Sequence, residues 1–220
     1  MTPTVAVIIP VLQRPHRAQP VVDSIMGTTD RARIVFVCSP GDIPQIEACH
    51  DTGQETILSD RGPGQGDWAH KINLGYRHTT EPLILLGADD LLFHPDWVEA
   101  AEAAAKPGVG VIGTNDLGNP RVIRGEHATH PIVTRDYADR FGTIDQPGLI
   151  AHEGYWHEFV DDEIVGTAKH RGAWVFAYDC VIEHLHPNWG KAPTDHLYDQ
   201  RPLRFKHGRR VFDQRRHLWT

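Results

Sequence analysis

Residues 83–90 read Leu-Ile-Leu-Leu-Gly-Ala-Asp-Asp, so an apolar run leads directly into two adjacent carboxylates. The run predicts a buried strand, with the acids where the strand meets its loop. In open α/β sheets, ligands bind outside the carboxyl ends of the strands. Two neighbouring carboxylates are costly there unless a cation or hydrogen-bond donors compensate them. A divalent metal with a phosphorylated ligand would do so. Alternatively, Asp90 caps a following helix and Asp89 is solvated.

The same alternation of strands and helices extends from the N-terminus to about residue 113. Further strands are predicted at residues 5–9, 34–38, 56–58 and 109–112, and helices at 17–26, 67–77 and 95–106. This order predicts an α/β fold, with a mostly parallel sheet flanked by helices. Beyond it we expect a loop-rich stretch over 114–160, a helix over 162–170 and strands over 174–178 and 181–182.

Length and composition restrict the class of protein. The 220 residues suffice for one large domain, or for a domain with a C-terminal extension. A net charge of −7 argues against a general binder of polyanions. No apolar run approaches the roughly 20 residues of a membrane span, and the first residues lack a signal-peptide pattern. With only three dispersed cysteines, these features predict a cytoplasmic protein.

Two common nucleotide-binding motifs are absent. A dinucleotide-binding domain needs Gly-x-Gly-x-x-Gly after its first strand, but residues 11–16 contain no glycine. The glycine-rich loop at 59–66 follows the third predicted strand instead, and no Gly-Lys-Ser/Thr of a phosphate-binding loop occurs. The sheet is therefore expected to hold a nucleotide by other means.

Four segments together resemble the family-2 glycosyltransferases, enzymes with a GT-A fold that use nucleotide-sugar donors. Residues 5–10 with Arg14 resemble the opening strand of that family, which ends in Pro10 at the donor nucleotide. The other three matches are residues 69–75 to its Ala-Arg-Asn-x-Gly helix, 85–90 to its Asp-x-Asp metal motif, and 160–164 with Gly172 to its Glu-Asp-x-Asp helix. The resemblance covers residues 4–186.

The resemblance implies a GT-A-like, Rossmann-type domain over 1–186. Residues 1–113 would form its nucleotide-sugar-binding half and 114–186 its acceptor and catalytic half, followed by a basic C-terminal extension, 187–220. The chain departs from the family where Gly87 replaces the first acid of Asp-x-Asp and Val160 replaces the Glu of Glu-Asp. The acidic contact to the base after the second strand is also missing, and Asp42 is the candidate substitute.

A nucleotide sugar leaves as a diphosphate, whose charge Mn²⁺ or Mg²⁺ can neutralise with carboxylate and imidazole ligands. Asp89 is the first candidate ligand. His184 and His186 follow a predicted strand and point to the same side of an extended segment, so one can bind metal while the other supports it. Alternatively, these histidines only pack and form hydrogen bonds.

An acceptor hydroxyl needs a general base within hydrogen-bond reach. Asp161 falls at the catalytic position of the family pattern, counted from Gly172, and Asp162 is the second candidate. The acids could instead only favour a helix N-terminus. With this base, transfer by a single displacement would invert the anomeric carbon. Tyr155 and Trp156 could form an aromatic platform for the acceptor, or belong to the core.

Arg14 and Lys71 are candidate contacts to the donor, which the family suggests is UDP- or GDP-linked. The basic stretch from Arg201 has two interpretations. In the first, it folds over the donor site or packs against a second copy in a homo-oligomer; in the second, it binds an anionic lipid, glycan or nucleic acid. The acidic remainder of the chain favours the first.

The sequence thus predicts a metal-dependent inverting glycosyltransferase that transfers a hexosyl or pentosyl group to an unknown hydroxyl acceptor. Two alternatives stay open. The first is a catalytically impaired nucleotide-sugar-binding protein of the same fold, which Gly87 and Val160 favour. The second is a nucleotidyltransferase, which would want a basic glycine-rich loop directly after the first strand.

Overall fold

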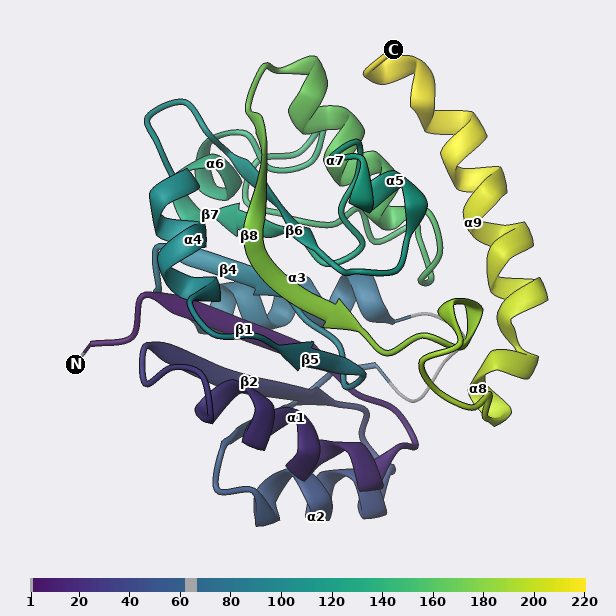
Figure 1. The fold of residues 1–220 in the computed structure, drawn as a ribbon. Coiled ribbons are helices and arrows are strands. Elements are labelled where there is room, and N and C mark those ends of the chain that lie inside the picture. Colours follow the sequence, from purple (N-terminus) through teal and green to yellow (C-terminus); the bar gives the residue numbers. More distant parts are fainter. Residues whose placement is uncertain (1, 62–66) are drawn as a thin grey trace.

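The computed structural model describes residues 2–61 and 67–220 (Figure 1). Most of the glycine-rich loop predicted at 59–66 lies outside these residues. The strands are β1 (Val5–Pro10), β2 (Ala32–Cys38), β3 (Glu55–Leu58), β4 (Leu83–Leu86), β5 (Leu91–Phe93), β6 (Val111–Asn115), β7 (Ile132–Thr134) and β8 (Trp174–His184). The α-helices are α1 (Ala18–Met26), α2 (Ile43–Asp51), α3 (Trp68–His78), α4 (Trp97–Ala104), α5 (Pro120–Ile123), α6 (Arg135–Arg140), α7 (Val160–His170), α8 (His196–Asp199) and α9 (Arg201–Arg215).

The described strands form one curved sheet in the order β3-β2-β1-β4-β7-β6-β8-β5. Strands β1 to β4 pair in parallel, as predicted. Strands β7 and β5 were not predicted from the sequence, and they pair antiparallel with their neighbours. Strand β7 lies between β4 and β6, so the two halves of the chain share one continuous sheet. The α/β class is confirmed.

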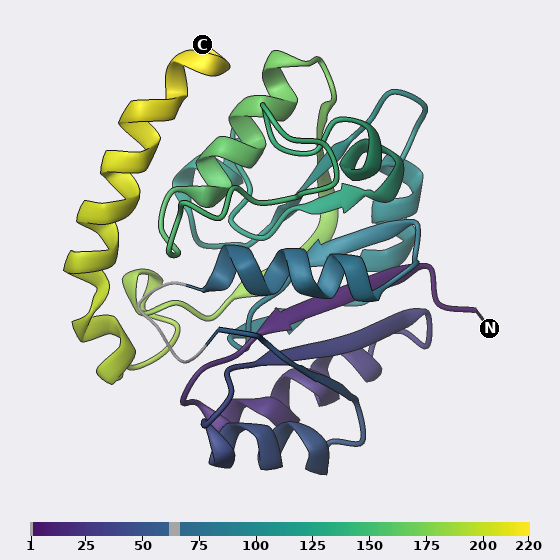
Figure 2. The same cartoon turned by 180° about the vertical axis from the view of Figure 1, so that it is seen from behind.

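The sheet is covered on both faces (Figures 1 and 2). Along β1 the side chains alternate, so Val7 and Ile9 join the core under α1, α2 and α4, whereas Ile8 joins the core under α3, α6 and α7. Because β1 lies at the centre and is buried on both faces, its continuous apolar run follows from its position. The long helix α9 lies beside this body and contacts α7.

Gly87 is explained by close packing of β4 against β1. A Cβ atom at this position would lie 2.8 Å from the backbone oxygen of Ile8, which already accepts a hydrogen bond from the Gly87 N–H at 2.8 Å. Backbone cannot yield as a flexible side chain can. The missing first acid of the Asp-x-Asp motif therefore has a steric reason in this chain.

We expect Gly87→Ala to lower the free energy of unfolding by about 1–3 kcal/mol, because the added methyl group forces β1 and β4 apart. Gly87→Asp, which restores the acid of the family motif, should cost at least as much. Urea denaturation followed by circular dichroism measures both changes. Wild-type stability for Gly87→Ala would contradict the steric explanation.

Candidate active site

The two acids after β4 are buried and paired with arginines. Asp89 is 8% exposed and Asp90 is 7% exposed. Arg14 Nη1 lies 3.3 Å from Asp89 Oδ1, and Arg17 Nη1 lies 3.2 Å from Asp90 Oδ2. The alternative of a solvated Asp89 is therefore wrong. Asp90 does not cap a helix either, because β5 follows it directly.

The pKa values of the two acids are shifted in opposite directions. Burial raises the pKa of Asp89 to about 7, and the adjacent Asp90 charge adds to the effect against the opposing charges of Arg14 and Arg17. Burial acts in the same direction on Asp90, but there the hydrogen bond from His184 and the nearby positive charges outweigh it. The pKa of Asp90 therefore lies below its ordinary value.

The turn after β1 directs Arg14 toward these acids. Gln13 has a left-handed backbone with φ of 51°, which costs free energy for a residue other than glycine. Its N–H donates to Asp42 Oδ2 at 2.7 Å, and the Arg14 N–H donates to Gln45 Oε1 at 2.7 Å. Asp42, predicted as a contact to the donor base, thus stabilises this turn and does not line the cleft described below.

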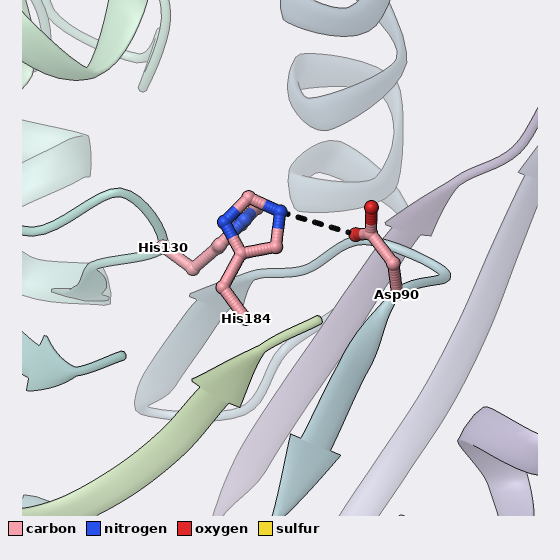
Figure 3. A group of neighbouring side chains, drawn as sticks. All are labelled: Asp90, His130 and His184. Carbon is pink, nitrogen blue, oxygen red and sulfur yellow. Dashed lines mark ion pairs between the residues drawn. The ribbon is translucent and has the colours of Figure 1, made fainter. Parts of the chain in front are cut away.

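Asp90 belongs to a buried group with two histidines. His184 Nε2 lies 3.4 Å from Asp90 Oδ1, and ligand atoms of Asp90, His130 and His184 all lie within 4.8 Å of one another (Figure 3). They come from the end of β4, the loop before β7 and the end of β8. Asp89 and His186, predicted as metal ligands, lie outside this group. His186 Nδ1 accepts a hydrogen bond from the Asn188 N–H at 3.0 Å.

The chemistry of His130 fits a metal ligand. A carbonyl oxygen can only accept, so His130 Nδ1 carries the proton that is donated to Leu86 O at 2.9 Å. Nε2 then holds a lone pair, and this atom is buried without a hydrogen-bond partner among the described residues. Burial and the neighbouring His184 lower the pKa of His130 to about 4, so the ring is neutral at pH 7. A backbone carbonyl that accepts from the other ring nitrogen and so fixes the tautomer is typical of metal-binding histidines.

The acids and histidines face a cleft of about 280 Å³ at the carboxyl ends of the strands. Pro10, Arg14, Lys71 and Asp89 line it, as do His184 and His186. Lys71 is 2% exposed, and its Nζ donates to Val11 O at 2.8 Å and lies 3.1 Å from Asp67 Oδ2. Asp67 directly precedes α3, but its side chain does not cap the helix, because its carboxylate is engaged with Lys71 and Ser39.

The two candidate bases at the start of α7 have different partners, although ligand atoms of Asp161, Asp162 and His127 all lie within 4.8 Å of one another. Asp161 lines the cleft, and its Oδ2 accepts from His127 Nε2 at 3.0 Å. Asp162 instead pairs with Arg121 of α5 at 2.8 Å and does not line the cleft. Burial raises the pKa of Asp161, but the His127 hydrogen bond outweighs it, so the pKa lies below its ordinary value. Burial and the negative charge of Asp161 raise the pKa of Asp162.

Helix α9 holds the entry to α7 in place. Phe159, the residue before α7, has φ of 71°, a strained value for an aromatic residue. Its ring packs against Phe205 and Phe212 of α9, at centroid distances of 4.8 and 5.6 Å. Arg215 of α9 also pairs with the buried Glu163 at 2.7 Å. The basic C-terminal stretch thus supports the helix that carries Asp161.

The segment before α9 closes over the acids. Asp195 accepts hydrogen bonds from Arg14 at 2.7 and 3.0 Å, and the Tyr198 hydroxyl donates to Asp90 Oδ2 at 3.4 Å. From the basic stretch that begins at Arg201, Arg201 and Arg204 line the same cleft. Of the two predicted platform aromatics, Tyr155 is a core residue at 1% exposure, whereas Trp156 lines the cleft.

Sequence reasoning missed several residues of this site: Arg17, His127, His130, Asp195 and Tyr198. Arg17 is spaced one helical turn from Arg14, a signal that was present. His127 and His130 stand in a segment rich in histidine, but their partners lie far away in sequence, which no local pattern reveals.

Within the described residues, no helix is long and apolar enough to cross a membrane.

No protein-family model and no curated protein matches the sequence. Solved structures do match the fold. A mannosyltransferase from Pyrobaculum calidifontis, in complex with GDP-Man and Mn²⁺, superposes with a TM-score of 0.66 at 20% identity. The match covers 94% of this chain but only 62% of that one.

Further matches include two complexes of glucosyl-3-phosphoglycerate synthase from Mycobacterium tuberculosis, each covering 96% of this chain. Its complex with Mg²⁺ and UDP has a TM-score of 0.62 at 12% identity over 79% of that chain. Its complex with Mn²⁺, UDP and phosphoglyceric acid has a TM-score of 0.61 at 13% identity over 78%. The chain therefore has the GT-A fold of nucleotide-sugar-dependent glycosyltransferases, as its sequence motifs predicted.

Proposed function

We propose that this protein is a metal-dependent glycosyltransferase, which transfers a hexosyl or pentosyl group from a UDP- or GDP-linked donor to a hydroxyl acceptor with inversion. The proposal depends chiefly on one observation: the neutral His130, with its lone pair free, meets Asp90 and His184 in a cleft that Asp161 also lines. The fold supports it, since the matched structures hold UDP or GDP-Man with Mn²⁺ or Mg²⁺.

Asp90, His130 and His184 are the proposed metal ligands. A divalent ion there would neutralise the diphosphate as the sugar bond breaks. Asp89, predicted from sequence as the ligand, is proposed instead to hold Arg14, because its closest charged partner is that guanidinium. Arg14 and Lys71 remain proposed donor contacts, and each would have to share its present carboxylate partner with the donor.

Asp161 is the proposed general base. Its carboxylate stays ionised at neutral pH because the pKa lies below the ordinary value, and His127 fixes its orientation. It would take the proton from the acceptor hydroxyl as that oxygen attacks the anomeric carbon. Asp162 is a weaker candidate, because its carboxylate pairs with Arg121 and does not line the cleft.

The impaired-binder alternative loses part of its basis. Gly87 has a packing reason, and Val160 is a core residue at 4% exposure. Neither departure from the family pattern therefore requires a loss of turnover. No feature of the described residues adds support for the alternative of a nucleotidyltransferase.

The first test is nucleotide binding with and without Mn²⁺, measured by calorimetry with UDP and GDP. We expect Mn²⁺-dependent binding of one nucleotide. Asp90→Asn, His130→Ala and His184→Ala should each weaken it by at least about 10–100-fold, because each removes a metal ligand. Asp89→Asn should have a smaller effect than Asp90→Asn.

His94→Ala is the matched control, because this half-exposed histidine contacts Glu183 on β8 outside the cleft. Thermal melts check that every variant is folded. If His130→Ala binds Mn²⁺ and nucleotide as tightly as the wild type, the proposed ligand set is wrong.

The second test is donor hydrolysis in the presence of Mn²⁺, with water as the acceptor. Asp161→Asn should lower kcat by about 10²–10⁴-fold without changing donor affinity, because it removes the base and leaves the donor contacts. Asp162→Asn is the matched comparison, with an expected loss under about tenfold.

Proton NMR of the freshly released sugar tests inversion, since an α-linked donor should first yield the β-anomer. Absence of turnover with every common UDP- and GDP-sugar, together with normal nucleotide binding, would favour the impaired-binder alternative. Retention of configuration would rule out the single displacement.

A further inference from the structure

Two arginines at the start of α9, Arg201 and Arg204, line the cleft together with Trp156 and Glu158. Other cations of the cleft are already paired. Arg14 binds Asp195 and Asp89, and Lys71 lies 3.1 Å from Asp67. Arg201 forms a longer and therefore weaker ion pair, with its Nε 3.4 Å from Glu158 Oε1.

Arg204 differs from these cations. Its Nη2 donates to the Leu197 carbonyl at 2.7 Å, but its buried Nε has no hydrogen-bond partner, and it forms no ion pair among the described residues. Burial lowers the pKa of Arg204, Glu158 opposes this, and the positive charge of Arg14 adds to the lowering. A buried guanidinium N–H without an acceptor costs free energy that an anion would offset.

The position of Arg204 in the first turn of α9 adds to the free-energy cost of its unpaired charge. The first turn of a helix favours anions, because the unpaired N–H groups and the helix dipole give it a partial positive charge. The first turn of α9 holds no acidic residue, and it carries Arg201 and Arg204 instead. Of these two arginines only Arg201 has an ion-pair partner among the described residues, so a bound anion would offset the remaining positive charge.

The neighbouring segment connects these arginines to the proposed base. Residues 156–158 run between α9 and the start of α7. The Trp156 ring stacks on His207 of α9 at a centroid distance of 3.9 Å. Gly208 of α9 approaches so closely that a Cβ atom there would lie 2.3 Å from Glu158 O. Arg204 and Asp161 therefore both line the cleft, and both lie close enough to Glu158 for their charges to shift its pKa.

We propose that Arg204, assisted by Arg201, binds a phosphate or carboxylate group of the acceptor. This inference rests on the proposed glycosyl transfer and names its acceptor class: a small hydroxy compound whose anionic group lies against α9 and whose hydroxyl faces Asp161. Arginine suits this role because its planar fork can bind both oxygens of either anion.

The test is calorimetric titration of the full chain, alone and saturated with Mn²⁺ and the nucleotide that binds. The probes are glycerol 3-phosphate, glycerate and uncharged glycerol. We expect one or both anions to bind at least tenfold more tightly than glycerol. Arg204→Met should remove this preference while leaving nucleotide affinity within twofold, and Arg204→Lys should restore part of it. Arg210→Met, an exposed position on α9, is the matched control.

The possible failures are distinguishable. If nucleotide binds but neither anion is preferred over glycerol, the acceptor subsite is wrong and the transferase proposal stands. If Arg204→Met weakens nucleotide binding and not anion binding, Arg204 serves the donor and the inference is overturned. If the anions bind through Arg204 but no nucleotide binds, the subsite stands and the donor proposal fails.

Discussion

The site depends on one electrostatic constraint: two adjacent carboxylates are buried at the end of β4, and two guanidinium groups must stay close to them. Removing such charges from water costs several kcal/mol for each ion unless opposite charges and hydrogen bonds compensate. Arg14 and Arg17 supply that compensation, and both come from the chain just after β1. Asp195 binds Arg14 in turn, so the C-terminal segment is drawn over the same point.

This constraint changes the argument for a metal. Two neighbouring acids in the sequence suggest a divalent cation, but arginines already balance their charge in the fold. The stronger argument is the lone pair of His130, which the Leu86 carbonyl orients toward Asp90 and His184. A metal entering this cleft would compete with the arginines for the carboxylates, and a diphosphate would compete with the carboxylates for the arginines. Donor binding and the Arg14–Asp195 contact are therefore expected to be coupled.

Much of the fold could be predicted from the sequence, because buried parallel strands are continuous apolar runs. Residues 83–86 form β4 as predicted, and the predicted alternation of strands and helices is observed as far as β6. Strand β7 could not be found, since three residues within a loop-rich region carry no periodic signal. Its pairing with β4 and β6 is decided by tertiary contacts, and these make the second half of the sheet mixed.

The sequence predicted which segments form the candidate site, but it predicted less well which side chains in them have which partners. Motif spacing identified the ends of β4 and β8 and the start of α7. It selected Asp89 rather than Asp90 as the metal ligand and Asp161 ahead of Asp162 as the base, but spacing cannot show which of two adjacent acids has which partners. In the structure, Asp90 lies with His130 and His184, whereas Asp161 accepts from His127 and Asp162 pairs with Arg121. His130 was missed for a related reason. Its role comes from a hydrogen bond to Leu86, 44 positions away in the chain.

The central claim is that Asp90, His130 and His184 form a metal site for a nucleotide donor. The most direct measurement is a crystal structure of the protein with Mn²⁺ and the nucleoside diphosphate that binds, using anomalous scattering to locate manganese. The account predicts manganese bound to Asp90, His130 and His184, with the diphosphate in the cleft beside it. Manganese bound through Asp89 without the histidines, or at His127, Asp161 and Asp162 instead, would contradict it.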